Sequence, residues 1–317
     1  MPSFVALTLG LSLAACGGDS EGNSTGSGTE SGGSEPLSGS VIADGSSTVE
    51  PLTSAAAELF QEEQPDVKVP VGTEGTSGGF ESFCAGKTDI SNASRAIDPE
   101  EAKVCEQAGI DFTELLVATD ALTVVSNPGV GVECVTTEQL KMIWEPAAEG
   151  KITNWSQVDS SFPDLSLELF GPGTDSGTFD YFTEEINGEE GASRSDYEAS
   201  EDDSVLVDGV INTEGGMGYF GFTYYEENAD SLTALQIDSG GGCVGPSAET
   251  AADGSYTPLS RPLYIYVANA SYTDKPQVAS FVDFYINNLP AVAEAARFIA
   301  LNDEQTQETA DALSQIQ

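Results

Sequence analysis

Gly171-Pro172-Gly173-Thr174-Asp175-Ser176-Gly177-Thr178-Phe179-Asp180-Tyr181-Phe182 is a turn of small and hydroxyl residues that runs directly into an apolar-periodic segment. Leucines alternate over 165–169 just before it, and Phe179, Phe182 and Ile186 follow at helical spacing. This pattern predicts a strand, a tight loop and a helix. A helix start leaves backbone N–H groups unpaired and carries the positive end of the helix dipole, so the turn is suited to hold an oxyanion.

The alternative for this turn is an ordinary helix cap, with Ser176 or Thr178 capping its own helix. Two further segments have the same construction. Residues 41–51 run from an apolar strand through Ser46-Ser47-Thr48 into a predicted helix, and residues 67–84 run from an alternating valine strand through a Gly/Thr/Ser turn into another. In an open α/β sheet such turns gather at the carboxyl edge of the strands, so three of them can converge on one ligand. The sequence therefore predicts an α/β fold with an anion site.

The N-terminal residues are predicted to be a targeting segment. Residues 4–13 form an apolar run too short to span a bilayer, and Leu13-Ala14-Ala15-Cys16 matches a bacterial lipobox, so residues 1–16 are interpreted as a lipoprotein signal peptide with lipidation at Cys16. No Lys or Arg precedes the apolar run, and we expect the true start to lie upstream. Residues 17–36 have the Gly/Ser/acidic composition of a flexible tether.

The charge of the chain excludes several partners. Ten basic and 53 acidic residues give a net charge of −43. Nucleic acid and anionic lipid surfaces would be repelled, so neither is expected to bind the folded domain. We interpret the acidic composition as keeping the protein surface solvated in high salt, or as keeping the protein soluble more generally.

Most catalytic chemistry lacks its residues. The chain has no histidine, which removes the Ser-His-Asp interpretation of the Gly-x-Ser-x-Gly pattern at 75–79, and no lysine follows the glycine turn as a P-loop requires. No Cys-x-x-Cys spacing exists, so we expect no metal site. A carboxylate-based hydrolase stays an alternative. Binding of an oxyanion fits better, with Arg95 and Arg194 as candidate ligand contacts and Arg261 and Arg297 interpreted as structural.

Four motifs together resemble the ligand loops of the PstS family, the phosphate-binding proteins of bacterial phosphate ABC importers. They occur in the family's order at 44–52, 75–80, 88–95 and 173–179. The resemblance implies a monomeric receptor that is not an enzyme and has no cofactor. It would bind inorganic phosphate outside the cytoplasm, anchored to the membrane through Cys16, and deliver it to a membrane ABC permease. The alternatives are another tetrahedral oxyanion such as sulfate or molybdate and, less favoured, a secreted phosphatase.

Carried over by motif, the resemblance implies a set of phosphate-binding residues and three further candidate contacts. The set is Ser47, Thr48, Thr76, Ser77, Arg95, Ser176, Gly177 and Thr178, and the further candidates are Ser46, Asp175 and Arg194. The chain departs from the best-studied branch of the family, which has an aspartate where Arg95 stands and an arginine near Pro172. A protonated phosphate donates a hydrogen bond and so needs an acceptor in the site, whereas sulfate has no proton to donate to that acceptor. Asp175 is the first candidate for that acceptor and Asp196 the second.

The fold implied is the two-lobed type II periplasmic-binding-protein fold, each lobe a mixed sheet flanked by helices, joined by two crossover hinge segments. Lobe 1 would comprise 37–120 and 260–317, and lobe 2 would comprise 121–259. The four cysteines after Cys16 allow three pairings. We favour Cys84–Cys105 and Cys134–Cys243, because each pair then lies within one lobe.

Overall fold

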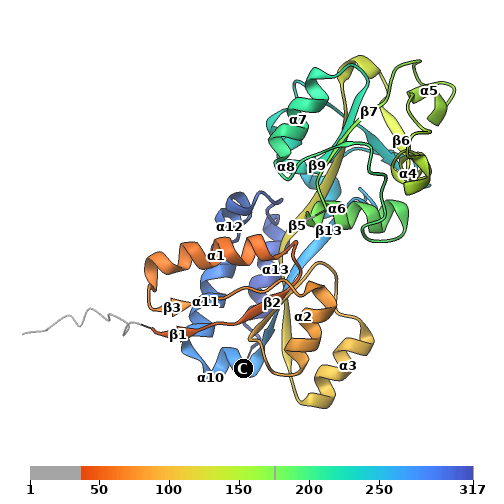
Figure 1. Cartoon of the computed structure of the whole chain (residues 1–317). Helices are drawn as coiled ribbons and strands as arrows, with labels where there is room; N and C mark the ends of the chain where they lie inside the picture. Colours follow the sequence, from red (N-terminus) through yellow and green to blue (C-terminus); the bar gives the residue numbers. More distant parts are fainter. Residues whose placement is uncertain (1–36, 175, 317) are drawn as a thin grey trace, which may run out of the picture. The chain divides into compact units, whose positions relative to one another are not determined.

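The computed structural model describes residues 37–174 and 176–316 (Figure 1). The predictions for the signal peptide 1–16, the lipidation site Cys16, the tether 17–36 and the candidate acceptor Asp175 lie outside the described residues. Within the described ranges, no helix is both long enough and apolar enough to cross a membrane.

A mixed sheet organises the fold, as the sequence predicted. Its strand order is β2-β4-β13-β5-β9-β7-β8, with β10 paired to β5. β4 and β5 flank β13 in antiparallel pairs, whereas β2 is parallel to β4 and β7 is parallel to β9. The strands of this sheet are β2 (Ala43–Gly45), β4 (Ile90–Ala93), β5 (Phe112–Ser126), β7 (Glu168–Gly171), β8 (Glu198–Ala199), β9 (Gly216–Gly221), β10 (Thr233–Ala234) and β13 (Ser260–Ala268).

Two small sheets complete the strand inventory of the described residues. β1 (Gly39–Ser40) pairs with β3 (Val67–Lys68). β12 (Cys243–Val244), β11 (Gln236–Asp238) and β6 (Cys134–Thr136) form a three-stranded sheet.

The helices fall into two groups along the chain. Those before β5 and after β13 are α1 (Glu50–Glu63), α2 (Gly75–Cys84), α3 (Pro99–Ala108), α10 (Asn269–Asp274), α11 (Pro276–Asn287), α12 (Leu289–Ala296) and α13 (Asp303–Leu313). Those between β5 and β13 are α4 (Thr137–Trp144), α5 (Trp155–Val158), α6 (Gly177–Phe182), α7 (Asp203–Asn212), α8 (Phe222–Glu227) and α9 (Ala248–Ala252). A π-helix, η3 (Thr183–Asn187), continues α6, and short 3-10 turns occupy Pro128–Val130 and Pro146–Ala148.

β5 carries the chain from one part of the sheet to the other. Its residues 112–121 pair with β13, and its residues 122–126 pair with β9. The two largest apolar clusters divide at the same place: one draws on residues 41–118 and 263–301, and the other on residues 122–259. The lobe boundaries at 120 and 260 remain a proposal, and this separation of the clusters supports it.

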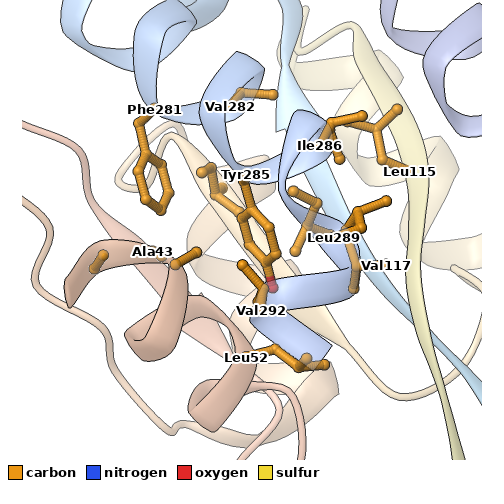
Figure 2. Close-up of a cluster of buried hydrophobic side chains, with 14 of the residues drawn as sticks. Ala43, Leu52, Leu115, Val117, Phe281, Val282, Tyr285, Ile286, Leu289 and Val292 are labelled. Atoms are coloured by element: carbon orange, nitrogen blue, oxygen red, sulfur yellow. The ribbon is translucent and has the colours of Figure 1, made fainter. Parts of the chain in front are cut away.

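The first cluster forms where α1, α11 and α12 cover one face of the sheet. Leu52, Ala56 and Phe60 recur every four residues along α1, so they share one face, and all three are buried. Figure 2 shows Tyr285 of α11 in the middle of this cluster, near Leu52 of α1. β13 alternates between two clusters: Ile265 and Val267 face this one, whereas Tyr266 packs with α2 and α3.

The valine strand before α2 is shorter than predicted. Only Val67–Lys68 is strand, and Val71 forms an isolated bridge with Ala43. Pro70 has no N–H to donate, so it interrupts a regular ladder, although its carbonyl still accepts from the Ala43 amide at 3.1 Å.

Both predicted disulfides are present. Cys84–Cys105 links α2 to α3, and Cys134–Cys243 links β6 to β12 at the edges of the three-stranded sheet. The other two pairings that four cysteines allow are therefore excluded.

Candidate functional site

The start of α1 is built from the turn that follows β2. Gly45 has φ +135°, and a Cβ there would lie 2.2 Å from the Asn92 carbonyl oxygen, so only glycine fits between β2 and β4. Ser46 is buried and its amide donates to the same carbonyl at 2.9 Å, whereas Ser47 is exposed. The N-cap residue Val49 supplies no side-chain hydrogen bond to the helix. The hydroxyls before α1 are thus not used up by capping it.

The start of α2 is also free of a side-chain cap. Its N-cap residue Glu74 makes no capping hydrogen bond. Thr76 Oγ1 lies 3.1 Å from Ser94 Oγ, and Ser77 Oγ accepts from Arg95 Nη2 at 3.0 Å. This second turn therefore joins Ser94 and Arg95, which follow β4, at one end of the sheet.

The start of α6 combines the two alternatives that the sequence left open. Ser176 Oγ accepts from the Thr178 amide at 3.2 Å, so Ser176 does cap its own helix. Gly177 nevertheless lies against the start of α1, because a Cβ on it would lie 3.0 Å from Thr48 Oγ1 and 3.7 Å from Ser47 Oγ. In this one turn Ser176 caps the helix, and Gly177 lies at the predicted site.

A cavity of about 770 Å³ brings most of the predicted residues together. Seven of them line it: Ser46, Ser47, Thr48, Thr76, Ser77, Arg95 and Gly177. Ser176 is not among the lining residues, and Thr178 lines a separate cavity of about 390 Å³. Three turns far apart in sequence thus meet at one cavity.

Arg194, predicted as a further ligand contact, and Asp196, predicted as the second candidate acceptor, are not among the residues that line this cavity. The Arg194 side chain is 3% exposed, and its Nη1 donates to the carbonyls of Ile143 and Ile152 at 3.0 Å each. Asp196 pairs with the same guanidinium, whose hydrogen bonds lower the pKa of Asp196 to about 2. Arg194 therefore joins the backbone at Ile143 and at Ile152. These partners are distant in sequence, so the local sequence of Arg194 did not distinguish this role from that of a ligand residue.

Arg95 lines the cavity but is heavily paired. Glu101 accepts from both Nη1 and Nη2 at 2.8 Å, and the Ala96 carbonyl and Ser77 Oγ take further bonds. This hydrogen-bonded ion pair lowers the pKa of Glu101 and raises that of Arg95. The side chain is 37% exposed. Arg95 therefore stands at the rim as one half of a surface ion pair.

Arg261, interpreted from the sequence as structural, is a cavity arginine that the sequence did not reveal. It lines the same cavity from the start of β13, with its side chain 14% exposed. Nε donates to Asp120 Oδ2 at 3.1 Å, and Nη2 donates to Thr48 Oγ1 at 2.8 Å. The only local signal was its place at the beginning of an apolar strand, which a surface arginine shares.

Carboxylates also line the cavity, and sequence reasoning did not identify them. They are Glu74, Asp180, Glu184, Glu185 and Glu190. Burial, with Glu190 nearby, raises the pKa of Asp180, and burial together with Glu184 raises that of Glu185. The cavity can therefore offer hydroxyl, amide and guanidinium donors together with carboxylate acceptors.

Over the part of the chain that the structure describes, no group of three or more acidic or cysteine side chains is arranged to hold a metal ion.

A two-lobed core, two crossing strands and a cavity lined by helix starts define a solute-binding protein. The chain belongs to the periplasmic-binding-protein superfamily, whose domain model matches residues 30–288, and within it to the family of the phosphate-binding protein PstS.

Known relatives cover most of the chain. It is 39% identical over 298 residues to the phosphate-binding protein PstS of Staphylococcus saprophyticus, covering 93% of this chain and 88% of that one. It is 48% identical over 266 residues to protein SphX of a Synechocystis species, covering 84% and 79% of the two chains. The crystal structure of a possible phosphate binding protein from Planctomyces limnophilus superposes with a TM-score of 0.82 at 42% identity, covering 88% and 98%.

Proposed function

We propose that this protein binds inorganic phosphate outside the cytoplasm and delivers it to a membrane ABC permease. The observation that carries the proposal is the convergence on one cavity of the hydroxyl-rich starts of α1 and α2, of Gly177 at the start of α6, and of two guanidiniums. Hydroxyl and backbone donors with arginine are the groups that recognise a desolvated oxyanion. The family supports the same ligand, since a curated relative bears the name phosphate-binding protein.

Within this cavity we assign phosphate contacts to six residues that line it and to two that adjoin it. The lining residues are Ser46, Ser47, Thr48, Thr76, Ser77 and Gly177, and Ser176 and Thr178 adjoin them at the start of α6. Arg194, which does not line the cavity, and Arg95, whose Nη groups are already paired, are left out of this set.

The carboxylates of the cavity favour phosphate over sulfate. A phosphate that keeps a proton at neutral pH can donate to a carboxylate, whereas sulfate offers no proton and would be repelled. We assign the acceptor to Asp180, because it lies four residues beyond Ser176 on α6 and its raised pKa reflects burial at the cavity wall. This replaces the predicted second candidate, Asp196.

The sequence and the disulfides support a proposed cellular setting. Two disulfides suit a compartment outside the cytoplasm, where such bonds persist. We propose a monomer, anchored through a lipid on Cys16 and reaching the permease on the tether 17–36, with no cofactor and no catalytic turnover.

Calorimetric titration of the full chain with phosphate and with sulfate tests the ligand. Phosphate should bind and sulfate should bind far more weakly. No heat with phosphate would contradict the proposal, and preferential sulfate binding would favour another tetrahedral oxyanion. Turnover of a chromogenic phosphoester that disappears on chelation would indicate a phosphatase instead.

A further inference from the structure

Arg261 occupies a special place on the two strands that connect the parts of the sheet. On β13 it lies directly opposite Asp120 of β5, one residue before β5 stops pairing with β13 and begins to pair with β9. Both side chains are largely buried, at 14% and 13% exposure, and they form an ion pair at 3.1 Å. A guanidinium fixed by a buried carboxylate in this way has a defined position.

The same guanidinium contacts elements from both sides of the crossing strands. Besides the bond to Thr48 before α1, its central carbon lies 3.6 Å from the ring centroid of Tyr181 on α6. The Tyr181 hydroxyl donates to the Pro258 carbonyl at 2.5 Å, which fixes the ring. Cation–π stacking and hydrogen bonding together hold the guanidinium at the cavity wall.

Donor availability separates Arg261 from Arg95. Arginine has five N–H donors. In the described ranges, Arg261 uses one on Nε and one on Nη2, which leaves the remaining three available. Arg95 uses both Nη groups twice, so only its Nε–H lacks a partner there. A bidentate contact to an oxyanion needs two free donors, which Arg261 can supply without breaking an existing bond.

We propose that Arg261 is the guanidinium that binds the oxyanion in this protein, with Asp120 and Tyr181 as its positioning residues. This inference rests on the proposed phosphate-binding function. The best-studied branch of the family has an arginine near the position of Pro172, and here Arg261 on β13 would supply that positive charge. Arg95 then remains one half of a structural ion pair at the rim of the cavity. Because Arg261 lies on β13 and also contacts Thr48 before α1 and Tyr181 of α6, occupancy of the site is coupled to the strands that connect the two parts of the sheet.

Phosphate titration of single variants of the full chain tests the assignment. Arg261→Gln should weaken phosphate binding by roughly 30-fold or more, as loss of a charge-assisted bidentate contact implies. Arg95→Gln should change it by less than about threefold, since its charge is already paired. Arg297→Gln is the matched control, because Arg297 also pairs with a carboxylate, Glu227, and stacks on a tyrosine, Tyr224, but lines the other cavity.

The outcomes separate this inference from the proposed function. If the unmodified chain binds no phosphate, both fail. If it binds phosphate and Arg261→Gln retains an affinity within threefold, only the assignment of Arg261 is overturned. Two further variants guard against misfolding of Arg261→Gln. Arg261→Lys keeps a cation beside Asp120 but loses the paired N–H donors of the guanidinium. The double variant Asp120→Asn with Arg261→Gln removes both charges, so that no buried charge is left unpaired. Wild-type affinity in either of these variants would also overturn the assignment.

Tyr181 gives an independent readout of positioning. Tyr181→Phe keeps the ring under the guanidinium and should bind phosphate within about threefold of the parent, whereas Tyr181→Leu should bind about tenfold more weakly. The thermal midpoint of each variant is measured alongside. Equal affinity of the phenylalanine and leucine variants would show that the stack does not position Arg261.

Discussion

A methyl group on Gly177 would lie 3.0 Å from Thr48 Oγ1, so the start of α6 approaches the start of α1 as closely as the absence of a side chain permits. These two turns are separated by more than a hundred residues in sequence. Thr48 is in turn held by Arg261 at 2.8 Å. Thr48 therefore contacts both the start of α6 and the Arg261 guanidinium at this cavity.

Gly177→Ala should weaken phosphate binding by about tenfold, because the added methyl crowds Thr48 and would push the two helix starts apart. The thermal midpoint should change little, since Gly177 has a backbone conformation open to any residue. Calorimetric titration measures the affinity. Gly241→Ala is the matched control, because a Cβ there meets nothing within 4 Å. An unchanged affinity in Gly177→Ala would show that the approach to Thr48 does not matter for binding.

Ser176→Ala should lower the free energy of unfolding by about 1 kcal/mol, because it removes the side-chain cap of α6. The Ser176 hydroxyl accepts from the Thr178 amide at 3.2 Å, so the loss is one of helix stability. Denaturant unfolding with and without phosphate separates this effect from a ligand contact. If Ser176 also binds the anion, the deficit should grow in the presence of phosphate.

Phosphate association should become faster with increasing ionic strength. Five carboxylates and two guanidiniums line the cavity, and the whole chain carries a net charge of −43. Salt shortens the Debye length from about 30 Å at about 0.01 M to about 3 Å at about 1 M, which screens this repulsion. Stopped-flow measurements of the association rate across that range check it. A rate that falls with salt would mean that local attraction by Arg261 and Arg95 exceeds the repulsion.

Asp203 should make the protein less stable as the pH rises through about 6. Burial, with Asp202 and Glu201 nearby, raises its pKa from 3.8 to about 6. A carboxyl with a raised pKa in the folded state stabilises that state below its unfolded pKa, and the contribution is lost as the pH rises through the folded pKa. Asp203→Asn should therefore gain about 1 kcal/mol relative to the parent at pH 8, after allowance for solvent screening. Unfolding free energies at pH 4 and pH 8 measure this, and an equal difference at both values would contradict it.

The two disulfides should differ in their contribution to stability. Cys134–Cys243 closes a loop with a sequence separation of 109, and Cys84–Cys105 one of 21. Restriction of the unfolded chain grows with loop length, so replacing the first pair by serine should cost about 4 to 5 kcal/mol and the second about 3 kcal/mol. Denaturant unfolding of the two double variants compares them, and a larger loss for Cys84–Cys105 would contradict the entropic argument.

The local elements of the site were predictable because each depends on neighbouring residues. The turn before α6, the turn before α1 and the one before α2 all have hydroxyl residues between an apolar strand and an apolar-periodic segment, and each does open a helix. The strand at 67–71 was predicted too long because alternation of side chains does not register the missing N–H of Pro70.

The roles of the arginines could not be predicted in this way. Arg194 and Arg95 lie in polar loops, where a ligand contact and an ion pair have the same local sequence. Asp196 and Glu101 decide between them, and only the folded chain shows how fully each carboxylate occupies its arginine.

The sequence by itself determined the α/β class, the helix starts with their hydroxyl donors, the absence of histidine chemistry and the acidic charge, because these follow from periodicity and composition. The tertiary structure decided which donors share a cavity and which guanidinium among them still has hydrogen-bonding capacity. Arg261 begins an apolar strand and looks structural along the chain. It lies opposite Asp120 because β13 pairs with β5, and it meets Tyr181 at the end of the predicted turn and helix only in the folded chain. Contacts between residues so far apart depend on strand register and packing, which no local pattern specifies.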